Sequence, residues 1–206
     1  MKTINLYLTL IFLMIGSVAI AQSSTSPDSV CAGATGKSYK VNGTAGSTYT
    51  WVINGGTQAS GGSTDSITVD WSATPGTDTL KVVEFNVIGC PGDTISLAVV
   101  RLPAPTATIS GTDSICINSS TGGAPLQLSF TGVGPWTVDY LEDGVTRNIS
   151  TSNNPYTFDS QVFASAGVKN YSVSTVSGRL GCSGSGSGSG SVTVFSKPAT
   201  SAIFHY

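Results

Sequence analysis

Apolar and polar residues alternate over short stretches along the chain, and this period of two predicts β-strands. Nine stretches share an enrichment in β-branched and aromatic residues: 48–53, 66–71, 80–85, 94–100, 126–130, 136–140, 156–158, 171–174 and 192–195. Turn-forming Gly, Pro, Asn and Asp lie between them, and no stretch after residue 21 shows the 3.6-residue period of a helix. The pattern predicts an all-β protein built as a sandwich.

One motif occurs twice and divides the chain into two copies. The tetrapeptide Asp-Ser-Val-Cys at 28–31 returns 85 residues later as Asp-Ser-Ile-Cys at 113–116, and Trp51 returns at the same offset as Trp136. Two prolines in the stretch 101–105 favour an extended, semi-rigid connection between the copies. The predicted segments are a signal peptide, two tandem β-sandwich domains and a tail: 1–21, 22–102, 103–196 and 197–206.

The chain has four cysteines, and in an exported protein these predict two disulfides. Four cysteines allow three pairings. If each copy is a closed unit, the bridges are Cys31–Cys90 and Cys116–Cys182. Each would close a loop of about 60 residues, which is worth roughly 4 kcal/mol in the chain-entropy model.

Residues 1–21 have the pattern of a secretory signal, with Lys2, an apolar run up to Ile20 and an Ala-x-Ala cleavage site ending at Ala21. The apolar run is about 15 residues long, whereas a membrane-spanning helix needs roughly 20. We therefore expect a secreted or cell-surface protein, with the periplasm as an alternative. No membrane insertion is expected after the signal is removed.

Charged residues make up only 10% of the chain, with 9 Lys+Arg, 11 Asp+Glu and a formal net charge of -2. Because the cations are too few to neutralise a run of phosphates, nucleic acid is not expected as a partner. The single histidine, His205, is next to last in the chain, and no serine has the G-x-S-x-G context of a hydrolase nucleophile. No catalytic residue, cofactor or metal is predicted, and the protein is not expected to be an enzyme.

Tryptophans and clustered carboxylates are the remaining candidates for binding. Trp51 and Trp136 lie in strand patterns 20 residues after a cysteine, where the core of a sandwich needs a large aromatic side chain. Trp71 ends a strand and is either packed or exposed as part of a sugar-binding platform. Three carboxylates at 139–143 either bind calcium or surround an Asp-Gly hairpin turn.

Several motifs resemble the PKD-like domains of exported Bacteroidetes surface proteins: Cys-x-Gly at 31–33, Tyr-x-Trp at 49–51, Asp-Trp at 70–71 and Gly-Cys-x-Gly-Asp-Thr at 89–94. The motifs at 134–138 and 154–156 are similar to the Ig-like repeats found beside those domains. The resemblance covers residues 28–196. It implies a β-sandwich of the kind used in surface adhesins, gliding-associated proteins and cargo of the type IX secretion system.

Five of the nine aspartates precede Ser or Thr and then an aliphatic residue. In exported Bacteroidetes proteins this tripeptide resembles the general O-glycosylation acceptor, which implies sugar on Ser29, Ser66, Thr79, Thr94 and Ser114. The alternative interpretation is that the tripeptide marks the start of strands, where a polar turn leads into a β-branched residue.

The end of the chain resembles the stretch that leads into the second copy. Residues 197–206 match 102–109, so the tail predicts an opening strand, formed by Ala202, Ile203, Phe204 and Tyr206, that pairs with a sheet edge elsewhere. The alternative is a frayed end, or one folded back on its own domain. The alternating Ser-Gly stretch at 183–191 predicts a loose loop, with a binding loop as the alternative.

Together these features predict a non-enzymatic, extracytoplasmic structural or adhesive protein with a protein partner or self-association. It would assemble head to tail, or dock on a larger surface complex through its C-terminal strand. The alternative function is a carbohydrate-binding module, with Trp71 in its platform and a glycan as ligand.

Overall fold

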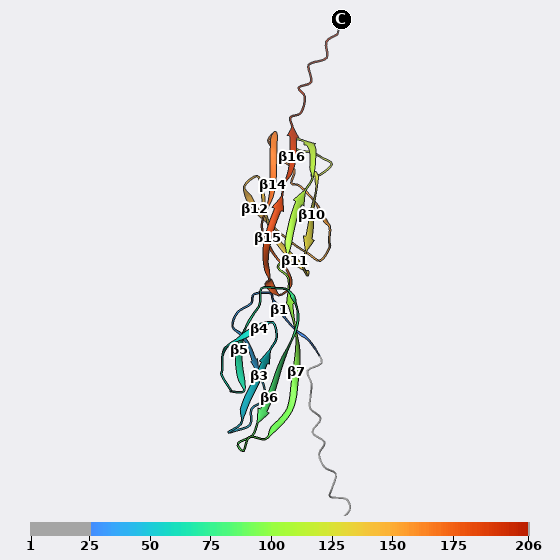
Figure 1. Ribbon diagram of the computed structural model, residues 1–206. Coiled ribbons are helices and arrows are strands. Elements are labelled where there is room, and N and C mark those ends of the chain that lie inside the picture. The colour runs from blue at the N-terminus through green and yellow to red at the C-terminus, as the bar shows by residue number, and fades with distance from the viewer. Residues whose placement is uncertain (1–25, 206) are drawn as a thin grey trace, which may run out of the picture.

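The computed structural model describes residues 26–205, and this part of the chain is all-β (Figure 1). The signal segment 1–21 and Tyr206 lie outside the described residues. The sixteen strands are β1 (Asp28–Cys31), β2 (Lys37–Lys40), β3 (Thr48–Ile53), β4 (Gly56–Ser60), β5 (Ser66–Trp71), β6 (Gly76–Phe85), β7 (Pro91–Leu102), β8 (Thr106–Ser110), β9 (Thr112–Cys116), β10 (Pro125–Thr131), β11 (Trp136–Glu142), β12 (Val145–Thr151), β13 (Tyr156–Asp159), β14 (Gly167–Ser177), β15 (Ser183–Gly188) and β16 (Gly190–Phe195). All nine stretches predicted from periodicity overlap one of these strands.

The N-terminal half, residues 28–102, forms a sandwich of two sheets. One sheet has the order β1-β7-β6-β3, and the other has the order β2-β5-β4. Alternation along β5 directs Ile67, Val69 and Trp71 into the space between the sheets, where they are almost fully buried. Leu80 and Val99 reach the same core from the facing sheet.

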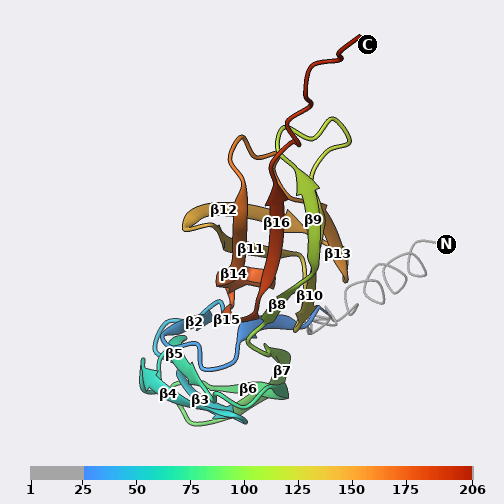
Figure 2. The ribbon, with the colours of Figure 1, turned by 90° about the horizontal axis from the view of Figure 1, so that it is seen from above.

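The C-terminal half, residues 106–195, is a second sandwich with its own core. On one side β11 lies between β12 and β14, and β14 pairs with β16, which lies beside β9 (Figure 2). On the other side β10 lies between β8 and β13. Strand β15 pairs with both β14 and β8, so the two layers join along that edge.

The two halves have separate hydrophobic cores. One core is drawn from residues 30–99 and the other from residues 107–194. Among residues 26–205, no strand pairing joins a strand of β1–β7 to a strand of β8–β16. The halves lie end to end and are connected by 103–105 (Figure 1).

The Ser-Gly stretch at 183–191 is not a loop, so that prediction is wrong. It forms β15 and the start of β16. A side chain at Gly184 would overlap the backbone of Pro105, and one at Gly186 would overlap Val173, so the glycines let β15 pack closely against its neighbours. The serines between them are exposed, and the alternation is that of a strand with a backbone-only inner face.

The predicted disulfide pairing is also wrong. The observed bridge joins Cys31 to Cys182, with a Cα–Cα distance of 5.4 Å, and Cys90 and Cys116 are free and exposed. Cys31 lies opposite Leu102, its strand neighbour at the end of β7, whereas Cys90 precedes the start of β7. The whole length of β7 therefore separates the two cysteines. A 12-residue strand spans about 40 Å, which is far beyond the reach of a disulfide.

The observed bridge crosses the junction between the halves. Cys31 lies beside the residue that leads into the 103–105 connection. Cys182 directly precedes β15, whose partner β8 begins where that connection ends. Both cysteines therefore flank the connection, and the bridge ties the N-terminal half to the C-terminal half.

Candidate assembly site

The C-terminal half contains a strand that has no counterpart in the described part of the N-terminal half. Strand β8 lies between β10 and β15 and directs Ala107 and Ile109 into the core, where both are buried. In the N-terminal half, β1 covers β7 only at Val99–Leu102. Within residues 26–205, the outer edge of β7 before Val99 and the outer edge of β2 carry no partner strand.

A groove lies between these two unpaired edges, and we name it the β2–β7 groove. It has a volume of about 170 Å³. Its lining is mostly apolar and consists of Tyr39, Val41, Trp51, Leu80, Val82, Ile95 and Leu97, with Lys40 and Ser96. A second hollow shares Val41, Val82 and Ile95 and extends along β7 to Gly92. The groove therefore follows the unpaired part of β7.

Hydrogen bonds hold one end of the groove in place. The Tyr39 hydroxyl donates to Asp28 Oδ2 at 2.8 Å and accepts from the indole nitrogen of Trp71 at 3.2 Å. Burial of the Tyr39 ring, followed by its hydrogen bond to Asp28, raises the pKa of this phenol. The phenol therefore stays neutral, and the wall formed by β2 is tied to β1.

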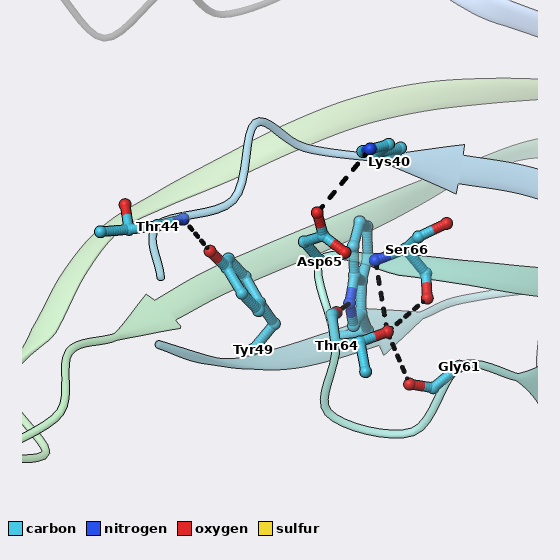
Figure 3. A network of polar contacts seen from close by, with 8 residues as sticks. Lys40, Thr44, Tyr49, Gly61, Thr64, Asp65 and Ser66 are labelled. Atoms are coloured by element: carbon cyan, nitrogen blue, oxygen red, sulfur yellow. Dashed lines mark hydrogen bonds and ion pairs between the residues drawn. The ribbon is translucent and has the colours of Figure 1, made fainter. Parts of the chain in front are cut away.

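Two residues of the groove lining, Lys40 and Trp51, also take part in a network of loop contacts (Figure 3). The Tyr49 hydroxyl accepts from the Thr44 backbone N–H at 2.9 Å, and Trp51 donates its indole N–H to the Thr64 carbonyl at 3.0 Å. Lys40 Nζ lies 3.9 Å from Asp65. Hydrogen bonds from Ser47 and then from Thr44 lower the pKa of Glu84, which faces this region. The floor and walls are thus fixed by contacts within the N-terminal half.

The tail predicted to be an assembly strand is exposed and makes no strand pairing in the part that the structure describes. Ile203 is 100% exposed and Phe204 is 75% exposed, and Ala202 is exposed as well. Figure 1 shows the tail extending away from the C-terminal half. Tyr206, the fourth residue of the predicted strand, lies outside the described residues.

Each end of the molecule also exposes apolar side chains beside a free cysteine. Val87 and Ile88, in the turn before Cys90, are 75% and 80% exposed. At the opposite end Phe195, the strand partner of Cys116, is 56% exposed. Apolar groups of this size at both ends mark surfaces that suit contact with protein.

The proposed sugar-bearing residues all lie within the first four residues of strands. Thr94 and Ser114 are exposed, and the others are half-buried. Their aspartates are used within the fold: Asp28 accepts from Tyr39, Asp65 lies near Lys40, and Asp78 forms an ion pair with the buried Arg101. All five residues thus lie within strands, and both glycosylation and the strand-start interpretation stay predictions.

The tryptophans belong to the packing of the two cores. Trp136 is buried and stacks on Phe130 with a ring separation of 4.9 Å, as predicted. Trp51 is partly buried and packs against the N-terminal core. Trp71 is only 3% exposed, so it offers no platform for a sugar.

The clustered carboxylates have separate partners. Asp139 accepts from Asn148, and Asp143 pairs with Lys169 at 2.7 Å. Glu142 is buried and accepts from Arg147 and from the Tyr171 hydroxyl. Asp143 and Gly144 have the positive φ angles of a tight hairpin turn, in agreement with the Asp-Gly interpretation.

Neither a metal site nor a membrane span is found in residues 26–205. No three His, Cys, Asp or Glu side chains of this part of the chain are grouped so that they could hold a metal ion. No helix in the same range is long and apolar enough to cross a bilayer.

Comparisons with known proteins give one family match and several similar structures. Residues 17–99 match the family model of the PKD-like domain, and no curated protein sequence matches the chain. Among solved structures, the CbhA fibronectin(III)-like modules of Clostridium thermocellum share 17% identity, with coverage of 90% of this chain and 98% of theirs and a TM-score of 0.34.

Two further structures cover larger proteins. The titin I-band fragment I67-I69 shares 10% identity over 84% of this chain and 63% of its own, with a TM-score of 0.38. A Bacteroides ovatus glucan-utilisation protein, SGBP-B, solved with a mixed-linkage heptasaccharide, shares 14% identity over 81% of this chain and 42% of its own, with a TM-score of 0.25. These identities and scores carry no functional information about the chain.

Proposed function

We propose that the protein is a non-enzymatic structural element of the cell exterior that assembles head to tail, with the tail of one copy filling the β2–β7 groove of the next. The observation that supports this most directly is the mismatch between the halves. The C-terminal half completes its sandwich with β8, while the described part of the N-terminal half leaves the equivalent place open. Residues 22–102 and 103–196 act as two folding units in this proposal.

The tail resembles β8, the strand that has no counterpart in the described part of the N-terminal half. Ser201–Phe204 align with Thr106–Ile109 of β8, each following a Pro-Ala pair. Ala202 and Phe204 then correspond to Ala107 and Ile109, which are buried, and Ile203 corresponds to Thr108, which is exposed. An incoming strand would place Ala202 and Phe204 on the groove and direct Ile203 to solvent.

The register follows from the face of β7 that lines the groove. Ile95 and Leu97 pair with the buried Val82 and Leu80, whereas Ser96 between them is exposed. Because paired residues of neighbouring strands share a face, Ala202 and Phe204 would lie opposite Ile95 and Leu97 of the next copy. Backbone pairing with an open edge supplies affinity, and the apolar pocket supplies specificity.

The chain's own N-terminal residues are a poorer match for the groove. At the repeat offset, 21–25 stand where β8 has 106–110, and they place Gln22 and Ser24 at the two buried positions. Burying a polar side chain without a partner in an apolar groove is unfavourable, whereas burying the apolar ring of Phe204 there is favourable. The tail of a second copy is therefore the better occupant.

The test compares the size of the wild-type protein with that of tail variants by light scattering over a range of concentrations. We expect wild type to form concentration-dependent oligomers, and both deletion of 199–206 and Phe204→Ser to give monomers. Ile203→Ser is the matched control, because it removes a similar apolar side chain from the outward face. It should assemble like wild type.

A second measurement isolates the groove. A fluorescent peptide with the sequence of 197–206 should bind the tail-deleted protein, and the same peptide with Phe204→Ser should not. Monomeric wild type at every concentration, or equal effects of the two serine substitutions, would overturn the proposal.

A further inference from the structure

The two free cysteines occupy places that match the two bridged ones. Cys31 pairs with Leu102 in the parallel strands β1 and β7, and Cys116 pairs with Phe195 in the parallel strands β9 and β16. The next hydrogen bond is also shared, since Ala32 donates to the Leu102 carbonyl at 2.9 Å and Ile117 donates to the Phe195 carbonyl at 2.8 Å. Cys116 is thus the structural counterpart of Cys31 in the C-terminal half.

Cys90 matches Cys182 in the same way. The residue four positions before each cysteine donates its backbone N–H to that cysteine's carbonyl, at 3.1 Å from Asn86 and at 2.9 Å from Gly178. In each turn the glycine just before the cysteine, Gly89 or Gly181, has a positive φ. The two turns share this hydrogen bond and this glycine conformation, and they differ at the residue before the glycine, where Leu180 has a positive φ and Ile88 does not.

Burial distinguishes the bridged pair from the free pair. Leu102, beside Cys31, is 7% exposed and Cys182 is 3% exposed. At the two ends of the molecule, Phe195 is 56% exposed and Cys90 is exposed. The junction between the two halves therefore buries the surroundings of Cys31 and Cys182, whereas the equivalent surroundings of Cys116 and Cys90 at the two ends of the molecule are exposed to solvent.

We infer that Cys116 of one copy forms a disulfide with Cys90 of the next, so that the junction between copies repeats the Cys31–Cys182 junction within each copy. The inference rests on the proposed head-to-tail assembly. Cys90 and Cys116 of one chain lie at opposite ends of the molecule and cannot meet, as Figure 1 shows from the positions of β6, β7 and β16. A head-to-tail contact brings one of each together.

The bridge forms by thiol–disulfide exchange with a small disulfide as the oxidant. The Cys116 thiolate attacks a sulfur of that disulfide and releases one thiolate, which leaves a mixed disulfide on Cys116. The Cys90 thiolate of the next copy attacks the Cys116 sulfur and releases the second thiolate. Two protein thiols thus lose two protons and two electrons, and the oxidant gains both as two thiols.

The tail gives the junction the reach that it needs. Three residues, 103–105, connect Leu102 to β8 at the internal junction, and five residues, 196–200, connect Phe195 to the proposed strand at 201–204. The connection between copies is therefore at least as long as the one that already brings Cys31 and Cys182 together.

The experiment uses the exported protein, oxidised with glutathione disulfide and separated on non-reducing gels. We expect wild type to give a ladder of covalent multimers that collapses on reduction. Cys90→Ser and Cys116→Ser should each run as a monomer on the non-reducing gel, because neither variant alone can form the Cys116–Cys90 disulfide. An equal mixture of the two variants should give covalent dimers and nothing larger, because only one Cys116–Cys90 contact is then available. Peptide mapping should find a peptide that links Cys90 to Cys116.

Three outcomes would overturn the inference. One is wild type that stays monomeric after oxidation, and another is a single variant that forms dimers alone, which would indicate like-with-like pairing. The third is a mixture of the variants that gives no dimer.

Failure of the bridge and failure of the assembly remain distinguishable. The double variant Cys90→Ser/Cys116→Ser keeps the groove and the tail, so light scattering on it tests assembly without the disulfide. Assembly of this variant combined with a wild type that gives no ladder would refute the bridge alone. A monomeric double variant at all concentrations would instead count against the proposed strand exchange.

Discussion

Removing the Cys31–Cys182 bridge should destabilise the less stable half strongly and the other half very little. The bridge closes a loop with a sequence separation of 151, which is worth about 5 kcal/mol when the whole chain unfolds. If the N-terminal half unfolds first, Cys182 stays anchored beside Pro105, so the loop is only about 75 residues long and the bridge is worth roughly 4.5 kcal/mol. The loop has nearly the same length if the C-terminal half unfolds first.

The remaining step gains little from the bridge. Since the total is about 5 kcal/mol and the first step takes roughly 4.5, the second step keeps only about 0.5 kcal/mol. A bridge inside each half would have stabilised both steps by similar amounts. The position of the bridge across the junction is therefore visible in the unfolding curve.

The assay is urea unfolding followed by tryptophan fluorescence, in a Cys90→Ser/Cys116→Ser background that prevents covalent assembly. Adding Cys31→Ser/Cys182→Ser should move the first transition to lower urea and leave the second almost in place. Trp136→Phe leaves only Trp51 and Trp71, which assigns the signal of the N-terminal half. Equal shifts of both transitions, or a first transition that does not move, would refute the reasoning. A single transition would show that the halves unfold together.

Two further predictions concern buried polar groups. Asp78→Ala should lower the free energy of unfolding by about 3–5 kcal/mol in thermal or urea unfolding, because it leaves the buried charge of Arg101 without its ion-pair partner. Asp159→Ala, at an exposed position, is the control, and a similar loss there would contradict the argument. Burial and then the Glu142 hydrogen bond raise the pKa of Tyr171, so this group contributes stability that is complete below its unfolded pKa of about 10 and is lost as the pH rises above that value. Thermal unfolding between neutral and strongly alkaline pH should show a shallower alkaline loss for Tyr171→Phe than for wild type, and parallel curves would count against this origin.

Alternation of residue types was sufficient to predict nine of the sixteen strands, because each half buries one face of each sheet. β5 illustrates this: Ile67, Val69 and Trp71 are buried while the residues between them are half-exposed. The repeat of the Asp-Ser-x-Cys motif likewise predicted equivalent strands, β1 and β9, and both pair in parallel with the last strand of their own half.

The cysteine pairing could not be predicted from that repeat. The sequence shows which cysteines are equivalent, but it does not show whether equivalent cysteines face inward to their own half or outward to the next one. That depends on the length of β7, which separates Cys31 from Cys90, and on the short 103–105 connection, which brings Cys182 close. The strand at 183–188 was missed for a related reason, because its inner face is glycine and carries no hydrophobic signal.

The proposed bridge between copies has a mechanical consequence, because the covalent path from Cys90 to Cys116 is short. It runs through β7, β8 and β9, which hold 12, 5 and 5 residues. Strand residues rise about 3.3 Å each and reach at most roughly 3.6 Å, so tension between the cysteines would lengthen these strands by only about 10 Å.

Unfolding a half that was pulled through its first and last residues would instead release hundreds of ångströms, since its roughly 75 residues can each extend by up to about 3.6 Å. Single-molecule pulling on an oxidised multimer should therefore show stiff extension without unfolding steps. The Cys90→Ser/Cys116→Ser assembly should separate at low force, because only backbone pairing and the Phe204 contact would hold its copies together. Repeated long unfolding steps in the oxidised multimer would show that the load does not follow the β7–β9 path.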